Sequence, residues 1–222
     1  DVSKVKNTFK RYVSKQVVDE ILDNEAKLNL GGEKREVVVL FTDIRGFTSM
    51  SEKMEPEKVV TTLNEYFTDM IDIVFKHNGT IDKIIGDELM VVYGAPLSTD
   101  NDTERAIETA VEMQQKIKEL NKERKKRKEG PICVGVGINR GDVISGNIGS
   151  RDMMDYTVIG DTVNLGSRLC SFAEADDIII SKSVWQTIRN DFQFKKLTPI
   201  KVKGKEKKVE IYKLIDFKSL NI

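Results

Sequence analysis

The order of hydrophobic patterns along the chain constrains its fold more than any other feature of the sequence. Runs with the composition or two-residue period of β-strands alternate with segments whose apolar side chains recur every three or four positions, as on one helical face. In order, the strand (β) and helix (α) patterns cover residues 36–41 (β), 56–77 (α), 80–85 (β), 88–93 (β), 103–120 (α) and 132–139 (β). Gly86-Asp87 joins the two consecutive strands and favours a tight hairpin. This order predicts an α+β fold, a ferredoxin-like βαββαβ antiparallel sheet with helices on one face.

Further patterns predict carboxy-terminal additions to this core. They are a strand at 154–159, a helix at about 161–172, a strand at 178–181, a short helix around Trp185 and a final strand pair ending at Leu214.

Glycines mark one face of the strand predicted at residues 132–139. Apolar residues there alternate with Cys133, Gly135, Gly137 and Asn139, which leaves this face nearly bare. We expect another backbone or helix to approach closely at these glycines. Their spacing, continued by Gly141, does not match the dinucleotide-binding fingerprint and argues against a Rossmann fold.

Composition excludes several classes of protein. The 36 basic and 36 acidic side chains balance, whereas nucleic-acid-binding proteins usually carry a basic excess, so no nucleic-acid partner is expected. Cys133 and Cys170 have no metal-ligand spacing and are expected to be buried thiols in a reducing compartment. No apolar run reaches the roughly 18 residues of a membrane span, so we expect a cytoplasmic segment without direct membrane insertion. Because the first residue is Asp1 rather than Met, a fragment of a longer protein is expected, although a processed chain would begin in the same way.

Two aspartates follow strand patterns directly. Asp43 comes after the run at 36–41, and Asp87 occupies the hairpin tip, so neighbouring strands could bring the two carboxylates together. Paired carboxylates bind Mg²⁺ and leave coordination sites for substrate phosphates, as in two-metal phosphoryl chemistry. Considered singly, Asp43 is better explained as a helix N-cap and Asp87 as a turn residue.

Three longer blocks favour the chemical explanation. They are Phe41-Thr-Asp-Ile-Arg-Gly-Phe-Thr48, Asp82-Lys-Ile-Ile-Gly-Asp-Glu88 and Asp155-Tyr-Thr-Val-Ile-Gly-Asp-Thr-Val-Asn-Leu-Gly-Ser-Arg-Leu169. In this order they resemble three blocks of the class III adenylyl and guanylyl cyclases, and the resemblance spans about residues 36–214. It implies that residues 33–222 form a cyclase catalytic domain.

The resemblance assigns the reacting centre. Asp43 and Asp87 match the metal-binding aspartates, with the Ile44 carbonyl as a further ligand, for two Mg²⁺ or Mn²⁺ ions per active site. One ion would lower the pKa of the ribose 3′-hydroxyl for attack on the α-phosphorus, and the other would hold the triphosphate and the leaving pyrophosphate. Asn164 and Arg168 match the pair that positions the ribose and stabilises charge on the α-phosphate. Their spacing of four on a predicted helix puts both on one face.

The resemblance also assigns residues to the base and the triphosphate. Lys83 matches the lysine that donates to adenine N1, and Thr157 matches the partner that accepts from the adenine N6 amino group. Guanylyl cyclases usually carry Glu and Cys at these positions, so ATP is favoured over GTP. Arg151 and Lys203 match residues that hold the triphosphate, although the alignment of Lys203 could slip to one of two nearby lysines, Lys201 or Lys205.

A homodimer is implied as well. In the family the aspartates come from one catalytic domain and the base and transition-state residues from another, so one sequence with both sets forms two interfacial sites, and a monomer is inactive. Apolar residues from Val5 to Leu22 predict one amphipathic helix within an amino-terminal linker at residues 1–32. Its segment 9–18 resembles the linker of bacterial receptor-type cyclases, so fusion to a membrane or sensor module is expected. Whether its apolar face pairs with a second copy or packs on its own domain stays open.

The function implied is that of an adenylate cyclase, a lyase that converts ATP to 3′,5′-cyclic AMP and pyrophosphate in signal transduction. The alternatives are a guanylate cyclase and a degenerate cyclase-like module that only binds nucleotide or a regulatory partner. Degenerate homologues typically lose an aspartate, the asparagine or the arginine, and this chain has all of them.

Overall fold

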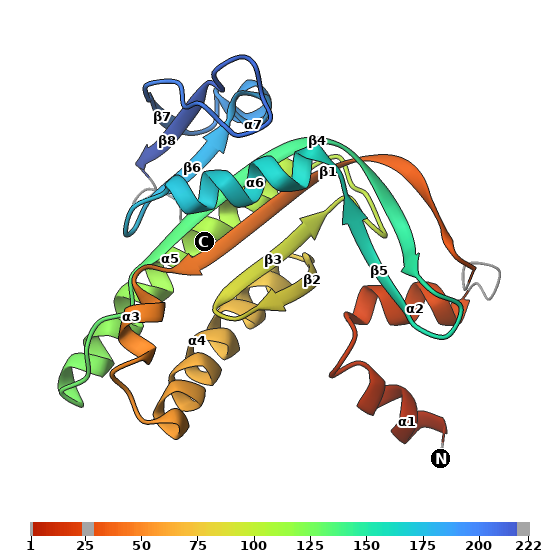
Figure 1. Cartoon of the computed structure of the whole chain (residues 1–222), viewed down its shortest axis with the longest axis horizontal. Helices are drawn as coiled ribbons and strands as arrows, with labels where there is room; N and C mark the ends of the chain where they lie inside the picture. The colour runs from red at the N-terminus through yellow and green to blue at the C-terminus, as the bar shows by residue number, and fades with distance from the viewer. Residues whose placement is uncertain (1, 24–28, 217–222) are drawn as a thin grey trace.

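The computed structural model describes residues 2–23 and 29–216 (Figure 1). Its centre is an eight-stranded sheet with the strand order β2-β3-β1-β4-β6-β8-β7, and β5 pairs with β4 outside this path. The strands are β1 (Gly31–Ile44), β2 (Thr80–Ile85), β3 (Glu88–Tyr93), β4 (Val134–Gly149), β5 (Met154–Ile159), β6 (Ile178–Ser181), β7 (Gln193–Lys196) and β8 (Ile211–Asp216).

The βαββαβ core is confirmed. In chain order it consists of β1, α4 (Pro56–Lys76), β2, β3, α5 (Asp102–Lys126) and β4. β1 is antiparallel to both β3 and β4, and β2 is antiparallel to β3. The sheet as a whole is mixed rather than antiparallel, because β6 pairs in parallel with β4. The chain reaches β6 through β5 and α6 (Asp161–Phe172), a crossover connection of the kind that parallel neighbours require.

The two core helices cover one face of the sheet, as expected, and α6 of the carboxy-terminal additions covers the other. Alternate residues of β1, such as Val38 and Leu40, pack in the core with α4 and α5. The intervening residues Val39 and Phe41 lie against Gly166 of α6. Figure 1 shows α6 and α5 on opposite sides of β1 and β4. The glycine face of β4 is the seat of α6: a Cβ at Gly137 would lie 2.1 Å from the backbone nitrogen of Cys170. The predicted close approach is therefore confirmed.

The amino-terminal segment forms two helices, α1 (Val2–Phe9) and α2 (Lys15–Asp23), and the single helix expected is wrong. Ser14 precedes α2 and accepts at its carbonyl from the Val18 amide at 3.0 Å. The Gln16 side chain donates to the Gly79 carbonyl at 2.8 Å, and Val17 and Val18 are buried. Because the helix is interrupted between α1 and α2, the apolar face of α2 can pack on its own domain. Apolar residues before α2, such as Tyr12, are exposed. Residues 24–28 of the linker lie outside the described residues.

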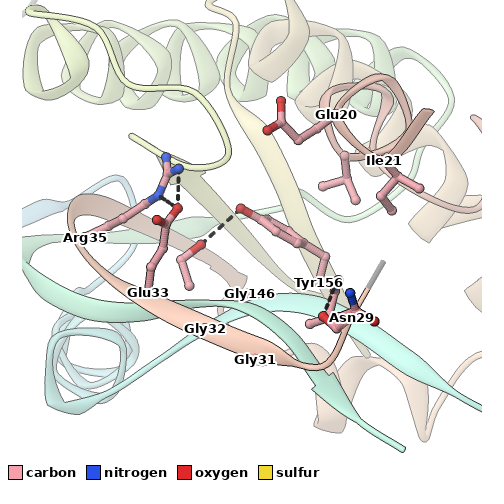
Figure 2. A pocket seen from close by; sticks show the side chains of 12 residues that line it. Glu20, Ile21, Asn29, Gly31, Gly32, Glu33, Arg35, Gly146 and Tyr156 are labelled. Atoms are coloured by element: carbon pink, nitrogen blue, oxygen red, sulfur yellow. Dashed lines mark hydrogen bonds and ion pairs between the residues drawn. The ribbon is translucent and has the colours of Figure 1, made fainter. Parts of the chain in front are cut away.

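A pocket of about 230 Å³ lies between α2, the start of β1 and the β4–β5 hairpin (Figure 2). Glu20 and Ile21 line it from α2, and Tyr156 lines it from β5. The Tyr156 and Ser145 hydroxyls form a hydrogen bond of 3.2 Å across its floor. Since successive strand residues face opposite ways, Thr157 points away from this pocket.

The remaining described helices are α3 (Phe47–Ser51) and α7 (Lys182–Ile188). No helix in the described ranges is both long and apolar enough to cross a membrane. Cys170 is buried, Cys133 is half-buried, and both are free thiols.

Candidate active site

Two carboxylates meet at the end of β1. Because β1 pairs with β3, with Thr42 opposite Leu89, the β2–β3 turn lies beside the end of β1. Gly86 takes the left-handed φ of 62° that this tight turn requires. Asp87 in the turn accepts at Oδ2 from the Ile44 backbone amide at 3.1 Å, and its carboxyl group contacts that of Asp43.

Charge accumulates at this carboxylate pair. Burial, the hydrogen bond to Asp87 and the repulsion of its charge raise the pKa of Asp43 to about 7. Arg45 opposes this shift, since its guanidinium donates to Asp43 Oδ2 at 2.9 Å. Burial and the neighbouring Asp87 also raise the pKa of Glu88. A cation bound here would remove this repulsion.

The donor set suits a hard divalent cation, which prefers carboxylate and carbonyl oxygens. Within residues 2–23 and 29–216, no group of three or more Asp, Glu, His or Cys side chains is arranged to hold an ion. Asp43, Asp87 and the Ile44 carbonyl would therefore need phosphate or water oxygens to complete the coordination. Such residues fit an ion that binds together with a nucleotide rather than a closed structural site.

Arg45 is a residue of this site that the sequence interpretation missed. Besides binding Asp43, it donates to the carbonyls of Ala173 at 3.1 Å and Ser171 at 3.4 Å. It thus fixes the carboxylate beside the end of α6. Its place two residues after Asp43 was the available indication, but the contact with α6 depends on the fold.

Lys83 and Thr157 come together around a third residue, Asp82. The Thr157 hydroxyl lies 2.9 Å from both carboxylate oxygens of Asp82. Lys83 Nζ lies 3.3 Å from Asp82 Oδ1 and 3.3 Å from Asp155 Oδ2. Burial raises the pKa of Asp82, while the Thr157 hydrogen bond and the Lys83 charge act against that rise.

A β-bulge explains how the consecutive residues Asp82 and Lys83 both reach strand β5. In a regular strand their side chains would point to opposite faces of the sheet. The pairing of β2 with β3 shifts register between Ile81 and Lys83, so Asp82 is left without a partner across the ladder. Bulges of this kind re-aim side chains, and both residues reach β5. Asp82 was missed as a functional candidate because a bulge cannot be recognised in the sequence.

Asn164 and Arg168 lie on α6, where Asn164 is exposed and Arg168 is half-buried. Arg168 donates to the backbone carbonyl of Lys203, which brings the loop before β8 against the helix. The Lys203 side chain is exposed, whereas Lys205 forms an ion pair with Asp161 at 2.5 Å.

The expected residues thus form separate groups in one chain. They are the carboxylate pair at the end of β1, the cluster of Lys83 and Thr157 around Asp82, and α6 with the Lys203 loop. Arg151 is exposed in the turn between β4 and β5. Among the described residues, no hydrogen bond or ion pair joins the carboxylate pair to Lys83, Thr157 or Arg168.

Comparison with known proteins identifies the family of this chain. Residues 32–216 match the family model for the adenylate and guanylate cyclase catalytic domain. An adenylate cyclase of Anabaena cylindrica is 34% identical over 96% of this chain, which spans 44% of that relative. The chain covers less than half of the curated relatives that it matches.

Two solved structures share the fold and a substantial part of the sequence. The crystal structure of the adenylyl cyclase CyaB from P. aeruginosa has a TM-score of 0.81 and 37% identity, covering 84% of this chain and 97% of that one. The guanylyl cyclase Cya2 has a TM-score of 0.77 and 38% identity, covering 83% and 94%. With the family model matching most of its length, the chain belongs to the family of adenylate and guanylate cyclase catalytic domains.

Proposed function

We propose that the domain is an adenylate cyclase that converts ATP to 3′,5′-cyclic AMP and pyrophosphate. The observation that carries the choice of ATP is the cluster in which Lys83 and Thr157 both contact Asp82, which is the proposed base pocket. Lysine can donate to the unprotonated N1 of adenine, and a hydroxyl can accept from the N6 amino group. The similarity to the guanylyl cyclase Cya2 makes GTP the substrate against which this proposal must be tested.

In this proposal Asp43, Asp87 and the Ile44 carbonyl hold two divalent ions, Mg²⁺ or Mn²⁺, with the triphosphate. When bound, these ions favour the ionised ribose 3′-hydroxyl and offset the charge of the leaving pyrophosphate. Asn164 orients the ribose, and Arg168 stabilises the charge that grows on the α-phosphate. Arg151 and Lys203 are exposed and are assigned to the triphosphate tail.

The working unit is a homodimer with two interfacial sites. Among the described residues, no hydrogen bond or ion pair joins the carboxylate pair to the base pocket within one chain, which supports a site completed by a second copy. Each copy offers both groups, so a two-fold axis would generate two equivalent sites.

The proposal also places the domain in the cytoplasm and attaches it to a sensor or membrane module. Two observations support the attachment. The chain spans less than half of its curated relatives, and α1 exposes Val5 and Phe9, which pairing with a second copy would cover.

The test is a product assay across protein concentration, with ATP or GTP and with Mn²⁺, Mg²⁺ or a chelator. We expect cyclic AMP, formed faster from ATP than cyclic GMP is from GTP, with specific activity that rises with concentration and then levels off. The chelator should stop product formation. No cyclic nucleotide at any concentration would refute the enzyme assignment, and faster turnover of GTP would refute the choice of substrate.

A further inference from the structure

We propose that Asp82 sets the base preference of Lys83 and Thr157 by accepting the hydrogen bond that the Thr157 hydroxyl donates. Thr157 can then only accept a hydrogen bond from the base. This inference rests on the proposed function and deepens it. It names the residue that restricts the Thr157 hydroxyl, which could donate or accept, to accepting a hydrogen bond from the base.

The geometry fixes the hydroxyl in one role. Thr157 is 6% exposed and the Asp82 side chain is 4% exposed, so water competes little for their hydrogen bond. Both carboxylate oxygens lie 2.9 Å from the Thr157 hydroxyl oxygen, which leaves its single proton no nearer acceptor among the described contacts. The positive charge of Lys83, 3.3 Å away, favours the ionised carboxylate that accepts this hydrogen bond.

The chemistry of the two bases supplies the selectivity. A threonine hydroxyl has one proton and two lone pairs, so alone it can bind either the amino group of adenine or the carbonyl of guanine. While the hydroxyl donates its hydrogen bond to Asp82, only its lone pairs are left for the base. The adenine amino group finds an acceptor, whereas the guanine carbonyl meets another acceptor, and its own lone pair goes unsatisfied.

Asp82 also contacts Lys83, so its loss will change turnover of both nucleotides. The informative quantity is therefore the ratio of kcat/KM for ATP to kcat/KM for GTP. Asp155 provides a matched control. It lies at the same 3.3 Å from Lys83, yet it makes no hydrogen bond to Thr157.

The experiment compares Asp82→Asn with Asp155→Asn in the full chain. The asparagine amide can donate to the Thr157 hydroxyl oxygen, which frees the hydroxyl proton to bind the guanine carbonyl. We expect Asp82→Asn to lower the ATP:GTP ratio by about tenfold or more, and Asp155→Asn to lower both kcat/KM values while leaving the ratio unchanged. Competition binding of non-cyclisable ATP and GTP analogues should show the same loss of discrimination without turnover.

Several outcomes overturn the inference. An unchanged ratio in Asp82→Asn, or an equal fall in both variants, removes the special role of Asp82. If Asp82→Asn does not fold, the isosteric Thr157→Val variant serves instead, and a ratio equal to that of the unmodified chain would show that the hydroxyl does not select the base. If the unmodified chain forms cyclic AMP and Asp82→Asn has the same ATP:GTP ratio of kcat/KM, this inference alone is refuted. If the unmodified chain forms no cyclic nucleotide at all, the proposed function is refuted.

Discussion

The close packing of α6 against Gly137 of β4 allows a quantitative prediction of the stability lost in a substitution. A methyl group added by Gly137→Ala would lie 2.1 Å from the Cys170 nitrogen and 2.7 Å from the Gly166 carbonyl oxygen. Ordinary contact begins at 3.4 Å, so α6 would have to move by about 1.3 Å. The opposing atoms are helix backbone, which cannot rotate away as a side chain can. We therefore expect a loss near the upper end of the overpacking range, about 3 kcal/mol in the free energy of unfolding.

Denaturant unfolding and thermal melting would measure this loss. For a chain of this size about 3 kcal/mol corresponds to a fall of about 6–12 °C in Tm. Gly130→Ala is the matched control, because a Cβ there meets nothing within 4 Å, and its free energy should stay within about 0.5 kcal/mol of the unmodified chain. Because α6 carries Asn164 and Arg168, the cyclase activity of Gly137→Ala should also decrease at temperatures below its Tm, where the variant is still folded. A Tm for Gly137→Ala equal to that of the control would show that α6 does not pack on this face.

Two further predictions concern the proposed site. Lys83→Glu combined with Thr157→Cys should shift preference from ATP toward GTP, because these side chains suit the donors and acceptors of guanine; product assays with both nucleotides measure the shift, and unaltered selectivity would contradict the base pocket. Asp43→Ala should abolish product formation while the circular dichroism spectrum and cooperative melting persist, because the carboxylate is half-buried at a strand end rather than in the core. Residual turnover comparable to that of the unmodified domain would contradict the metal role of Asp43.

Several elements were predicted from the sequence at their observed bounds. β5, α6 and β6 have the ranges expected from their periodicity, because strong patterns there lie between turn residues. The full lengths of the strands β1 and β4 were not predicted. β1 begins at Gly31 and β4 continues to Gly149, although the residues by which they exceed the expected strands are rich in glycine and polar side chains that disfavour strands. They pair with each other, Gly31 opposite Asn147, so each extension depends on a partner far away in the sequence.

The residues of the candidate site also divide into those identified from the sequence and those that only the structure revealed. The three sequence blocks singled out Asp43, Asp87, Lys83 and Thr157, and the structure places them as two contacting groups. It also added Asp82, whose side chain meets a residue 75 positions later through a bulge.

By itself the sequence determined the βαββαβ core, the elements β5, α6 and β6 that follow it, and the chemical types at the site, because periodicity and turn residues act over a few neighbouring positions. Only the tertiary structure decided that α6 covers the second face, that α2 packs on its own domain, and that Asp82 holds the Thr157 hydroxyl. The physical reason is that a local pattern specifies which face is apolar or polar, whereas the partner of that face comes from contacts between distant segments.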